Sequence, residues 1–338
     1  MTEVIRFGIL GSGSIARFHA NAIASLDNAL LVGVASSFWD DARRFAREYQ
    51  IKAYTDYNEM LADERIDAVC ICTPSGLHAE NAIQALRAKK HVVLEKPMAF
   101  TKAEAKTIAE EAEKSGCVLT VICQLRFSED VHRVKQLLAD GALGDLVFCD
   151  LYMKYWRDQA YYSSSNWKGT RRLDGGGALM NQGIHGIDLL LYLLGDAKVV
   201  HAKNCTRFHD IEVEDASMAM LEFANGAMGV IEGSTCVCPG FERRIEINGT
   251  RGSVIIVENQ IQKLIIDGET LVDKPRNAGN GTASNPTAFG CDLHARQISN
   301  FIDAVCGRDK LMITAAEGIR AVSLIEEIYQ FGLRGRQL

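Results

Sequence analysis

Short apolar runs alternate with amphipathic segments along the first third of the chain, and this alternation restricts the fold more than any other feature. Each run is continuously apolar, which is typical of strands covered on both faces. A strand-helix-strand order favours a parallel sheet with right-handed crossovers. The predicted strands are Val4–Leu10, Leu30–Ala35, Ala68–Cys72, His91–Leu94 and Val118–Cys123, and the predicted helices are Asp41–Tyr49, His78–Ala88 and Lys102–Ser115. Residues 1–124 are therefore expected to form a doubly wound α/β domain. Thr101 and Glu104 predict a capping box on its last helix.

After Phe127 the pattern changes to longer strands joined by turn signals. Ala216–Phe223 and Ala227–Thr235 flank Asn225-Gly226, a dipeptide that favours a type I′ hairpin, and Arg251-Gly252 separates two more β-rich runs. Residues 125–338 are expected to form an α+β domain with a large, mainly antiparallel open sheet. Further predicted elements are the helices Asp130–Asp140, Gly176–Leu194, Asp292–Cys306 and Thr314–Phe331, the strand Asp145–Lys154 and a mobile loop at Pro275–Ala288. Such a sheet lacks cover on one face, so we expect a homodimer or homotetramer that buries it.

Composition narrows the class of protein further. With 338 residues, 47% hydrophobic and 24% charged, the chain resembles ordinary globular proteins rather than disordered ones. No segment approaches the roughly 20 apolar residues of a membrane span and no leader pattern is present, so we expect a cytoplasmic protein without membrane partners. A net charge of −6 with scattered Lys and Arg argues against nucleic acid and favours a small-molecule partner. The ten cysteines form no CxxC pair, which indicates buried thiols in a reducing compartment and no metal site.

A glycine-rich turn follows the first predicted strand directly and opens a helix. The segment Gly11–Ala16 reads GSGSIA, and its strand-turn-helix context predicts a Rossmann dinucleotide site. Gly11 would make the tight turn, Gly13 would admit the pyrophosphate to the backbone, and Ser14 and Ile15 would present helix N–H groups to it. A flexible glycine turn is the alternative.

The end of the second predicted strand bears on the choice of dinucleotide. NAD-preferring sites usually carry an acidic residue there, which hydrogen-bonds the ribose 2′-OH. This chain has Ser36 and Ser37, whose hydroxyls could donate to a 2′-phosphate, and Arg43 or Arg44 lies one helical turn on. Asp40 and Asp41 oppose this interpretation. The pattern leaves both cofactors open and favours NADP(H) slightly over NAD(H).

Lys96 follows the predicted strand His91–Leu94, at the edge where doubly wound sheets place ligands. A Lys beside a cationic nicotinamide has a lowered pKa and can exchange protons with a substrate hydroxyl near neutral pH. The next residue, Pro97, is compatible with a cis peptide bond. Taken alone, a Lys at a strand end is more often a solvated charge.

A second polar cluster lies in the apolar segment Gly176–Leu194. On an α-helix, Asn181, His185 and Asp188 stand at positions i, i+4 and i+7 and so share one face. A structural helix in a core has no use for three polar groups on one face. We interpret this face as part of a site, although a hydrogen-bonded core histidine is the alternative for His185.

These motifs together resemble the Gfo/Idh/MocA family of NAD(P)-dependent oxidoreductases over essentially the whole chain. The motifs, in order, are GSGSIA at Gly11–Ala16, Thr73-Pro74 and His78, Glu95-Lys96-Pro97, Arg126-Phe127, Trp167-Lys168-Gly169, and Gly175–His185. The resemblance implies that Lys96 is the catalytic lysine, that Thr73, Pro74, His78 and Glu95 lie along the cofactor, and that His185 faces the reacting carbon. Arg126, Trp167, Lys168 and Asn181 would bind the substrate. The family acts mostly on sugars, sugar derivatives and inositols, so the second domain would bind a carbohydrate.

Asn181 departs from the inositol-type pattern, which has Asp four residues before the His. An amide can bond a hydroxyl but cannot hold a proton, so the acid/base work would fall to Lys96 and His185. The Asn181-Gln182 pair is similar to the branch that oxidises nucleotide-sugar uronates. Two alternatives remain: a cofactor-sensing regulator on the same fold, which would need neither Lys96 nor His185, and a metal site. The metal site would draw on His185, His209, Asp210 and Glu212.

Overall fold

The computed structural model describes residues 3–275 and 290–334, and the side chains of residues 3–275 and 290–331. The chain forms two compact units. The first unit comprises residues 1–124 and 290–319, and the second comprises residues 125–289 and 320–338. The predicted loop Pro275–Ala288 lies outside the described residues except for its first position. Among the described residues, no helix is long and apolar enough to cross a membrane.

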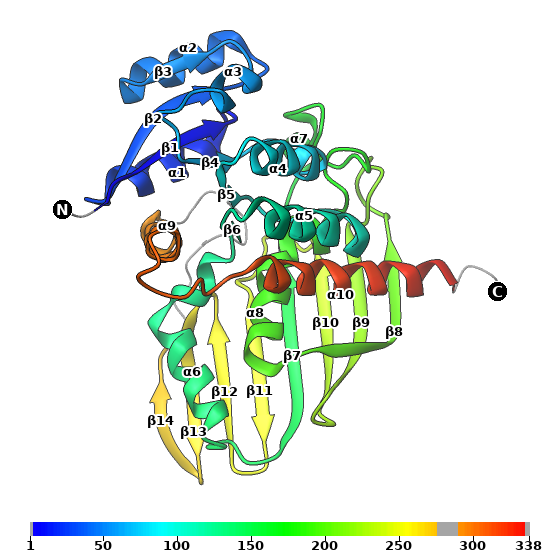
Figure 1. The fold of residues 1–338 in the computed structure, drawn as a ribbon. Helices are drawn as coiled ribbons and strands as arrows, with labels where there is room; N and C mark the ends of the chain where they lie inside the picture. The colour runs from blue at the N-terminus through cyan, green and yellow to red at the C-terminus, as the bar shows by residue number, and fades with distance from the viewer. Residues whose placement is uncertain (1–2, 276–289, 335–338) are drawn as a thin grey trace. The chain divides into compact units, whose positions relative to one another are not determined.

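The first unit is built on a six-stranded parallel sheet, as predicted (Figure 1). Its strand order is β3-β2-β1-β4-β5-β6, which reverses between β1 and β4. Both faces of the central strands are buried, and this explains why their sequences are continuously apolar. The strands are β1 (Ile5–Leu10), β2 (Ala29–Ala35), β3 (Lys52–Tyr54), β4 (Ala68–Ile71), β5 (His91–Leu94) and β6 (Leu119–Val121). Strand β3 lies at the edge of the sheet and begins with the exposed Lys52, so it lacks the continuous apolar run that marks the predicted strands.

Helices cover both faces of this sheet, with α1 and α9 on one face and α4 and α5 on the other (Figure 1). The helices are α1 (Ser14–Ala24), α2 (Trp39–Tyr49), α3 (Tyr57–Leu61), α4 (His78–Arg87), α5 (Lys102–Ser115) and α9 (Asp292–Val305). The predicted capping box of α5 is confirmed: the Glu104 N–H donates to Thr101 Oγ1, and the Thr101 N–H donates to the Glu104 carboxylate, each at 3.2 Å.

Helix α9 belongs to the first unit, although the sequence-based division placed all of residues 125–338 in one domain. The reason is its apolar face: Ile298, Phe301 and Ile302 join the buried cluster formed by β1 and α1. The Gln297 side chain also accepts from the Cys123 N–H at 3.1 Å and donates to the Val121 carbonyl at 2.8 Å. Strand β6 lies at the edge of the sheet and pairs with one strand only. The two bonds from Gln297 give partners to backbone groups of Val121 and Cys123 at this edge.

The second unit is built on an eight-stranded, mainly antiparallel sheet, as predicted. Its order is β14-β13-β12-β11-β7-β10-β9-β8, and β7 pairs parallel with β10. Helices α6 and α8 lie on one face (Figure 1). The strands are β7 (Leu146–Lys154), β8 (Ala197–Cys205), β9 (Ala216–Phe223), β10 (Met228–Ser234), β11 (Arg244–Gly249), β12 (Gly252–Val257), β13 (Gln260–Ile266) and β14 (Glu269–Asp273), and the helices are α6 (Glu129–Ala139), α7 (Gln159–Ser163), α8 (Ile184–Leu194) and the C-terminal part of α10 (Ala315–Arg334).

Three local expectations differ from the structure. The β9–β10 hairpin forms, but its turn is not type I′, because only Gly226 has a positive φ of 85° and the Gly226 N–H donates to the Phe223 carbonyl at 2.9 Å. This is a type I turn closed by a glycine in the left-handed region. The predicted helix Gly176–Leu194 divides into a π-helical turn, Ala178–Gly183, and α8. The ten cysteines form no disulfide, but only Cys70, Cys72, Cys123 and Cys149 are buried.

Candidate active site

The glycine turn joins β1 to α1 and has the geometry that a dinucleotide site requires. Gly11 has a φ of +112°, and a Cβ there would meet the Cys72 carbonyl oxygen at 2.5 Å, so the position admits only glycine. A Cβ at Gly13 would meet no atom within 4 Å. Gly13 is the N-cap of α1 and supplies no side-chain cap. The N–H groups at this helix end are therefore available to an anionic ligand, and Ser14 and Ile15 begin the helix.

At the end of β2, Ser36 is tied to the glycine turn. The Ser12 hydroxyl donates to Ser36 Oγ at 3.1 Å, and Ser36 Oγ also accepts from the Phe38 N–H at 3.2 Å. Ser37 is exposed. Arg44 forms an ion pair with Asp41 on α2, which reduces the positive charge that it could offer to a phosphate.

Lys96 is half-buried directly after β5, and its peptide bond to Pro97 is cis. The loop after β4 is tied to the same segment through His78. One ring nitrogen of His78, Nδ1, lies 2.7 Å from the Pro97 carbonyl oxygen, and the other, Nε2, lies 3.0 Å from the Thr73 carbonyl oxygen. Burial lowers the pKa of His78. In the first unit, Thr73, Pro74, His78 and Lys96 therefore come together at the carboxyl edge of the sheet.

A buried ion pair lies under the Lys96 backbone. Glu95 is 4% exposed; its Oε1 lies 2.8 Å from His19 Nε2, and its Oε2 accepts from the Lys96 N–H at 3.2 Å. Burial alone would raise the pKa of Glu95, but the hydrogen bond and charge of His19 outweigh burial and lower this pKa to about 2. His294 on α9 stacks edge-on to His19, and burial with the nearby His19 lowers its pKa to about 4. His19 was not identified from the sequence, because nothing local marks its pairing with Glu95.

In the second unit, the glycine run before the π-helical turn allows close backbone approach. A Cβ at Gly177 would lie 2.0 Å from the Glu214 carbonyl oxygen, and one at Gly176 would lie 2.3 Å from the Tyr329 hydroxyl. The Glu214 carboxylate accepts from the Gly177 and Leu179 N–H groups at 2.9 and 2.8 Å. The glycine run thus places the first residues of the turn against Glu214, a residue that no sequence motif marks.

Asn181 lies on this π-helical turn, so the α-helical spacing to His185 that the sequence predicted does not hold. Its amide donates to Asp174 Oδ1, and the other carboxylate oxygen of Asp174 accepts from the Gly169 N–H at 2.7 Å. Gln182 donates to the Tyr161 hydroxyl at 2.9 Å and accepts from Arg157 Nε at 3.0 Å. The structure therefore places Asn181 in a polar network with the Trp167-Lys168-Gly169 loop.

Two cations face the Tyr161 ring in this network. Lys168 Nζ lies 4.1 Å from the ring centroid and the Arg157 guanidinium carbon lies 5.6 Å from it. Burial lowers the pKa of Lys168 below its usual value, and the Asp174 carboxylate offsets only part of this effect. Arg157, Tyr161 and Gln182 were not identified from the sequence, since their spacing resembles no motif.

Arg126 and His185 occupy different environments in the second unit. Arg126 is 1% exposed and forms a two-bonded pair with Asp188, from Nε at 2.9 Å and Nη2 at 2.6 Å. Its guanidinium also lies 4.8 Å from the Tyr192 ring centroid. Asp188 thus serves to hold Arg126. His185 is half-buried in the first turn of α8.

A Rossmann-type sheet with a fitted dinucleotide turn and a strand-end lysine, followed by an open mixed sheet, defines a two-domain dinucleotide-dependent oxidoreductase. Residues 5–123 match the model of the oxidoreductase family with an NAD-binding Rossmann fold, and residues 131–255 match the GFO/IDH/MocA C-terminal domain. The chain therefore belongs to the Gfo/Idh/MocA family, as its motifs indicated.

Similar proteins of this family cover almost the entire chain. Myo-inositol 2-dehydrogenase of Thermotoga maritima is 27% identical, over 95% of this chain and 94% of the relative. The NADP(+)-dependent scyllo-inositol 2-dehydrogenase IolW of Bacillus subtilis is 28% identical, over 96% and 92%. The WlbA dehydrogenase of Bordetella pertussis, solved with NADH and UDP-GlcNAcA, is 30% identical with a TM-score of 0.87, over 98% of each chain.

Proposed function

We propose that the protein transfers a hydride between a nicotinamide dinucleotide and a secondary alcohol or ketone of a sugar derivative, with Lys96 as the acid/base. The position of Lys96 at the carboxyl end of β5 carries the proposal. The glycine turn follows β1 in the same parallel sheet, and the carboxyl ends of parallel strands share one edge. Lys96 takes the hydroxyl proton in oxidation and returns it in reduction. His185 is the second catalytic residue, in agreement with the family resemblance.

The residues at this edge fit a dinucleotide. Gly13 leaves open space, and the N-terminus of α1 offers N–H groups to a pyrophosphate. Thr73, Pro74, His78 and Glu95 complete the proposed contacts. When bound, the dinucleotide supplies or accepts the hydride. We favour NADP(H) slightly over NAD(H), because Ser36 and Ser37 stand where a carboxylate would repel a 2′-phosphate.

The polar network of the second unit supports an acidic sugar derivative as the substrate. Arg157 and Lys168 bring two positive charges to Tyr161, and Asp174 brings one negative charge, so a substrate carboxylate or phosphate would balance the remainder. Asn181 and Trp167 complete the proposed substrate residues, whereas Arg126 is buried against Asp188 and is not proposed to contact the substrate. The WlbA relative was crystallised with a nucleotide-sugar uronate, and we propose the same chemical class for this chain.

We also propose that the open face of the second sheet forms a homodimer or homotetramer. Phe148, Met218, Met220 and Met228 are each 47–54% exposed, and register places them on one face of β7, β9 and β10. Light scattering after size exclusion tests this, and Met220→Glu should shift the mass toward the monomer. A wild type that runs as a monomer contradicts the proposal.

A substrate screen tests the catalytic proposal. Sugars, uronates and nucleotide sugars are each mixed with NAD(P)+ or NAD(P)H, and the nicotinamide absorbance is followed. We expect turnover with at least one acidic sugar derivative. Calorimetric titration with NADH and NADPH separates the failures: absent binding refutes the dehydrogenase proposal, whereas binding without turnover favours a cofactor-sensing regulator. Ser37→Asp should shift preference toward NAD(H), because a carboxylate accepts from the 2′-OH and repels a phosphate.

A further inference from the structure

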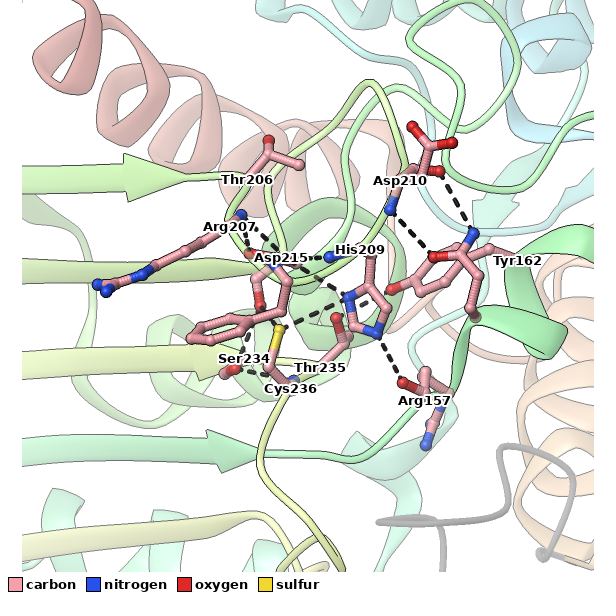
Figure 2. Close-up of polar contacts among 12 residues, drawn as sticks. Arg157, Tyr162, Thr206, Arg207, His209, Asp210, Asp215, Ser234, Thr235 and Cys236 are labelled. Atoms are coloured by element: carbon pink, nitrogen blue, oxygen red, sulfur yellow. Dashed lines mark hydrogen bonds and ion pairs between the residues drawn. The ribbon is translucent and has the colours of Figure 1, made fainter.

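Three side chains that no part of the proposed reaction uses meet at one end of the second sheet (Figure 2). His209 lies in the connection between β8 and β9, Asp215 precedes β9 directly, and Cys236 follows β10 by two residues. Their nitrogen, oxygen and sulfur atoms all lie within 4.8 Å of one another. The side chains of His209 and Asp215 are 5% and 0% exposed, and Cys236 is half-buried. We call these three residues the His209 cluster.

Two of the three separations within the His209 cluster match the edges of a tetrahedral zinc site. Zinc–nitrogen and zinc–oxygen bonds of about 2.0–2.2 Å imply an N···O edge of about 3.3–3.5 Å, and a zinc–sulfur bond of about 2.3 Å implies an N···S edge of about 3.5–3.6 Å. The observed distances are 3.4 Å from His209 Nδ1 to Asp215 Oδ2 and 3.6 Å from His209 Nδ1 to Cys236 Sγ. Strong charge-assisted hydrogen bonds are shorter, at about 2.7–2.9 Å. The Cys236 thiol lies within hydrogen-bonding distance of His209 Nδ1 and also donates to the Asp215 carbonyl oxygen at 3.5 Å, and the three side chains are close enough to share one cation.

Hydrogen bonds hold the His209 ring and the Asp215 carboxylate in place. His209 Nε2 lies 2.8 Å from the Arg157 carbonyl oxygen, to which it donates, and this leaves Nδ1 with its lone pair directed at the cluster. Asp215 Oδ2 accepts from the N–H groups of Arg207, Phe208 and His209 at 3.2, 2.7 and 3.0 Å. The Cys236 N–H donates to Ser234 Oγ at 3.0 Å. Metal-ligating side chains are typically held by such outer hydrogen bonds.

We infer that His209, Asp215 and Cys236 bind a divalent metal ion, with zinc as the best fit. An imidazole, a carboxylate and a thiolate are donors that zinc accepts, and the two anionic donors neutralise its charge. The thiol proton passes to solvent on binding. Water can reach the half-buried Cys236 side and fill the fourth position. The ion would lock the loop from Thr206 to Asp215 against Arg157, and so stabilise the second unit.

The metal site weighed from the sequence drew on different residues. Of its four members only His209 belongs to the cluster. The Asp210 N–H donates to Gln159 Oε1 at 3.0 Å, and Glu212 Oε2 accepts from the Arg171 N–H at 2.8 Å. The ligands of the His209 cluster stand at positions 209, 215 and 236, a spacing that resembles no zinc motif. Only the tertiary structure brings them together.

Metal content and unfolding temperature test the site on the full chain. Protein stripped with chelator and dialysed is given one equivalent of zinc sulfate, and bound metal is measured by mass spectrometry. We expect about one zinc per chain and a higher Tm than in the stripped protein. His209→Ala and Cys236→Ser should weaken zinc binding by about tenfold or more and lose the rise in Tm. His201→Ala and Cys238→Ser, which replace exposed residues of the same two types, should keep both.

Cobalt provides a spectroscopic readout that can be measured on the wild type itself, whatever the stability of the variants. Cobalt(II) added to the stripped wild type should give a thiolate charge-transfer band, which persists in Cys238→Ser and disappears in Cys236→Ser. Circular dichroism checks that each variant is folded. Failure of the stripped wild type to bind zinc or to give the cobalt band overturns the inference. Metal that remains in folded His209→Ala and Cys236→Ser but is lost in His294→Ala also overturns it, and assigns the ion to His19, Glu95 and His294.

Discussion

The proposed cofactor residues of the first unit and the proposed substrate residues of the second unit are built in different ways. Around the glycine turn and Lys96, the backbone makes the site: a left-handed glycine, an uncapped helix end and a strand end. In the second unit, side chains make the site, since Asp174, Asn181 and Gln182 bond one another and Arg157. A backbone site depends on a short contiguous segment, whereas a side-chain network depends on residues far apart in sequence. The backbone site should tolerate few substitutions. In the side-chain network, each substitution should reduce activity only in part.

The largest effect is expected at Lys96. Lys96→Met removes the proton carrier, so kcat should fall by about 10²–10⁴ while cofactor affinity stays within a few-fold. Single-turnover kinetics and calorimetric titration with the reduced cofactor measure the two quantities. Lys89→Met, at an exposed position on the same unit, is the control and should leave both unchanged. Wild-type turnover in Lys96→Met, measured where chemistry limits the rate, would refute the proposed role.

Alanine substitutions at the two glycines of the turn should impair different properties, stability at Gly11 and cofactor binding at Gly13. Gly11→Ala places a Cβ 2.5 Å from the Cys72 carbonyl oxygen at a positive φ, and should destabilise the fold by about 2–4 kcal/mol. Gly13→Ala meets no atom of the chain within 4 Å, so it should fold normally but bind the cofactor about tenfold or more weakly. Urea unfolding and calorimetric titration distinguish the two. Equal stability of the two variants would contradict the assigned geometry.

The ion pair beneath Lys96 should make stability depend on pH. The pKa of Glu95 is lowered from 4.5 to about 2, which corresponds to about 3 kcal/mol of stabilisation. This stabilisation is present in full above pH 4.5 and is lost as the pH falls toward 2. Glu95→Gln should therefore lower the free energy of unfolding most at neutral pH and progressively less in acid.

Urea denaturation of both proteins between pH 7 and pH 3 measures the Glu95 effect. Glu110→Gln, at an exposed position on α5, is the control, and its difference from wild type should be small throughout. A Glu95→Gln difference that stays constant with pH would indicate that the pair contributes through packing alone.

The smallest effect is expected at Asn181. Asn181→Ala removes the amide that bonds Asp174, and should raise KM by a few-fold without moving the pH–rate profile. Asn181→Asp adds a negative charge four residues before His185, which should raise the pKa of His185 and move the alkaline rise of the oxidation rate to higher pH. Rate profiles of the wild type and both variants decide between the roles. A profile that stays in place in Asn181→Asp would make Asn181 a residue of the π-helical turn only.

Much of the first unit was predictable because its signals are local. Buried parallel strands need continuous apolar runs, the turn at Gly11 needs a residue without a side chain, and the cap of α5 uses two residues three positions apart. Strand β3 and helix α9 were not assigned to this unit. Strand β3 is only partly apolar, and the apolar face of α9 does not specify which sheet it covers.

The sequence by itself determined the family, the two kinds of sheet, and the positions of the glycine turn and Lys96 at strand ends. All of these follow from backbone requirements that a few neighbouring residues must meet. Only the tertiary structure decided that Glu95 pairs with His19, that Arg126 is held by Asp188, and that Asn181 lies on a π-helical turn. It also decided that His209, Asp215 and Cys236 meet. Hydrogen bonds and ion pairs between side chains depend on distances across the fold, and those distances exist only once the chain has packed.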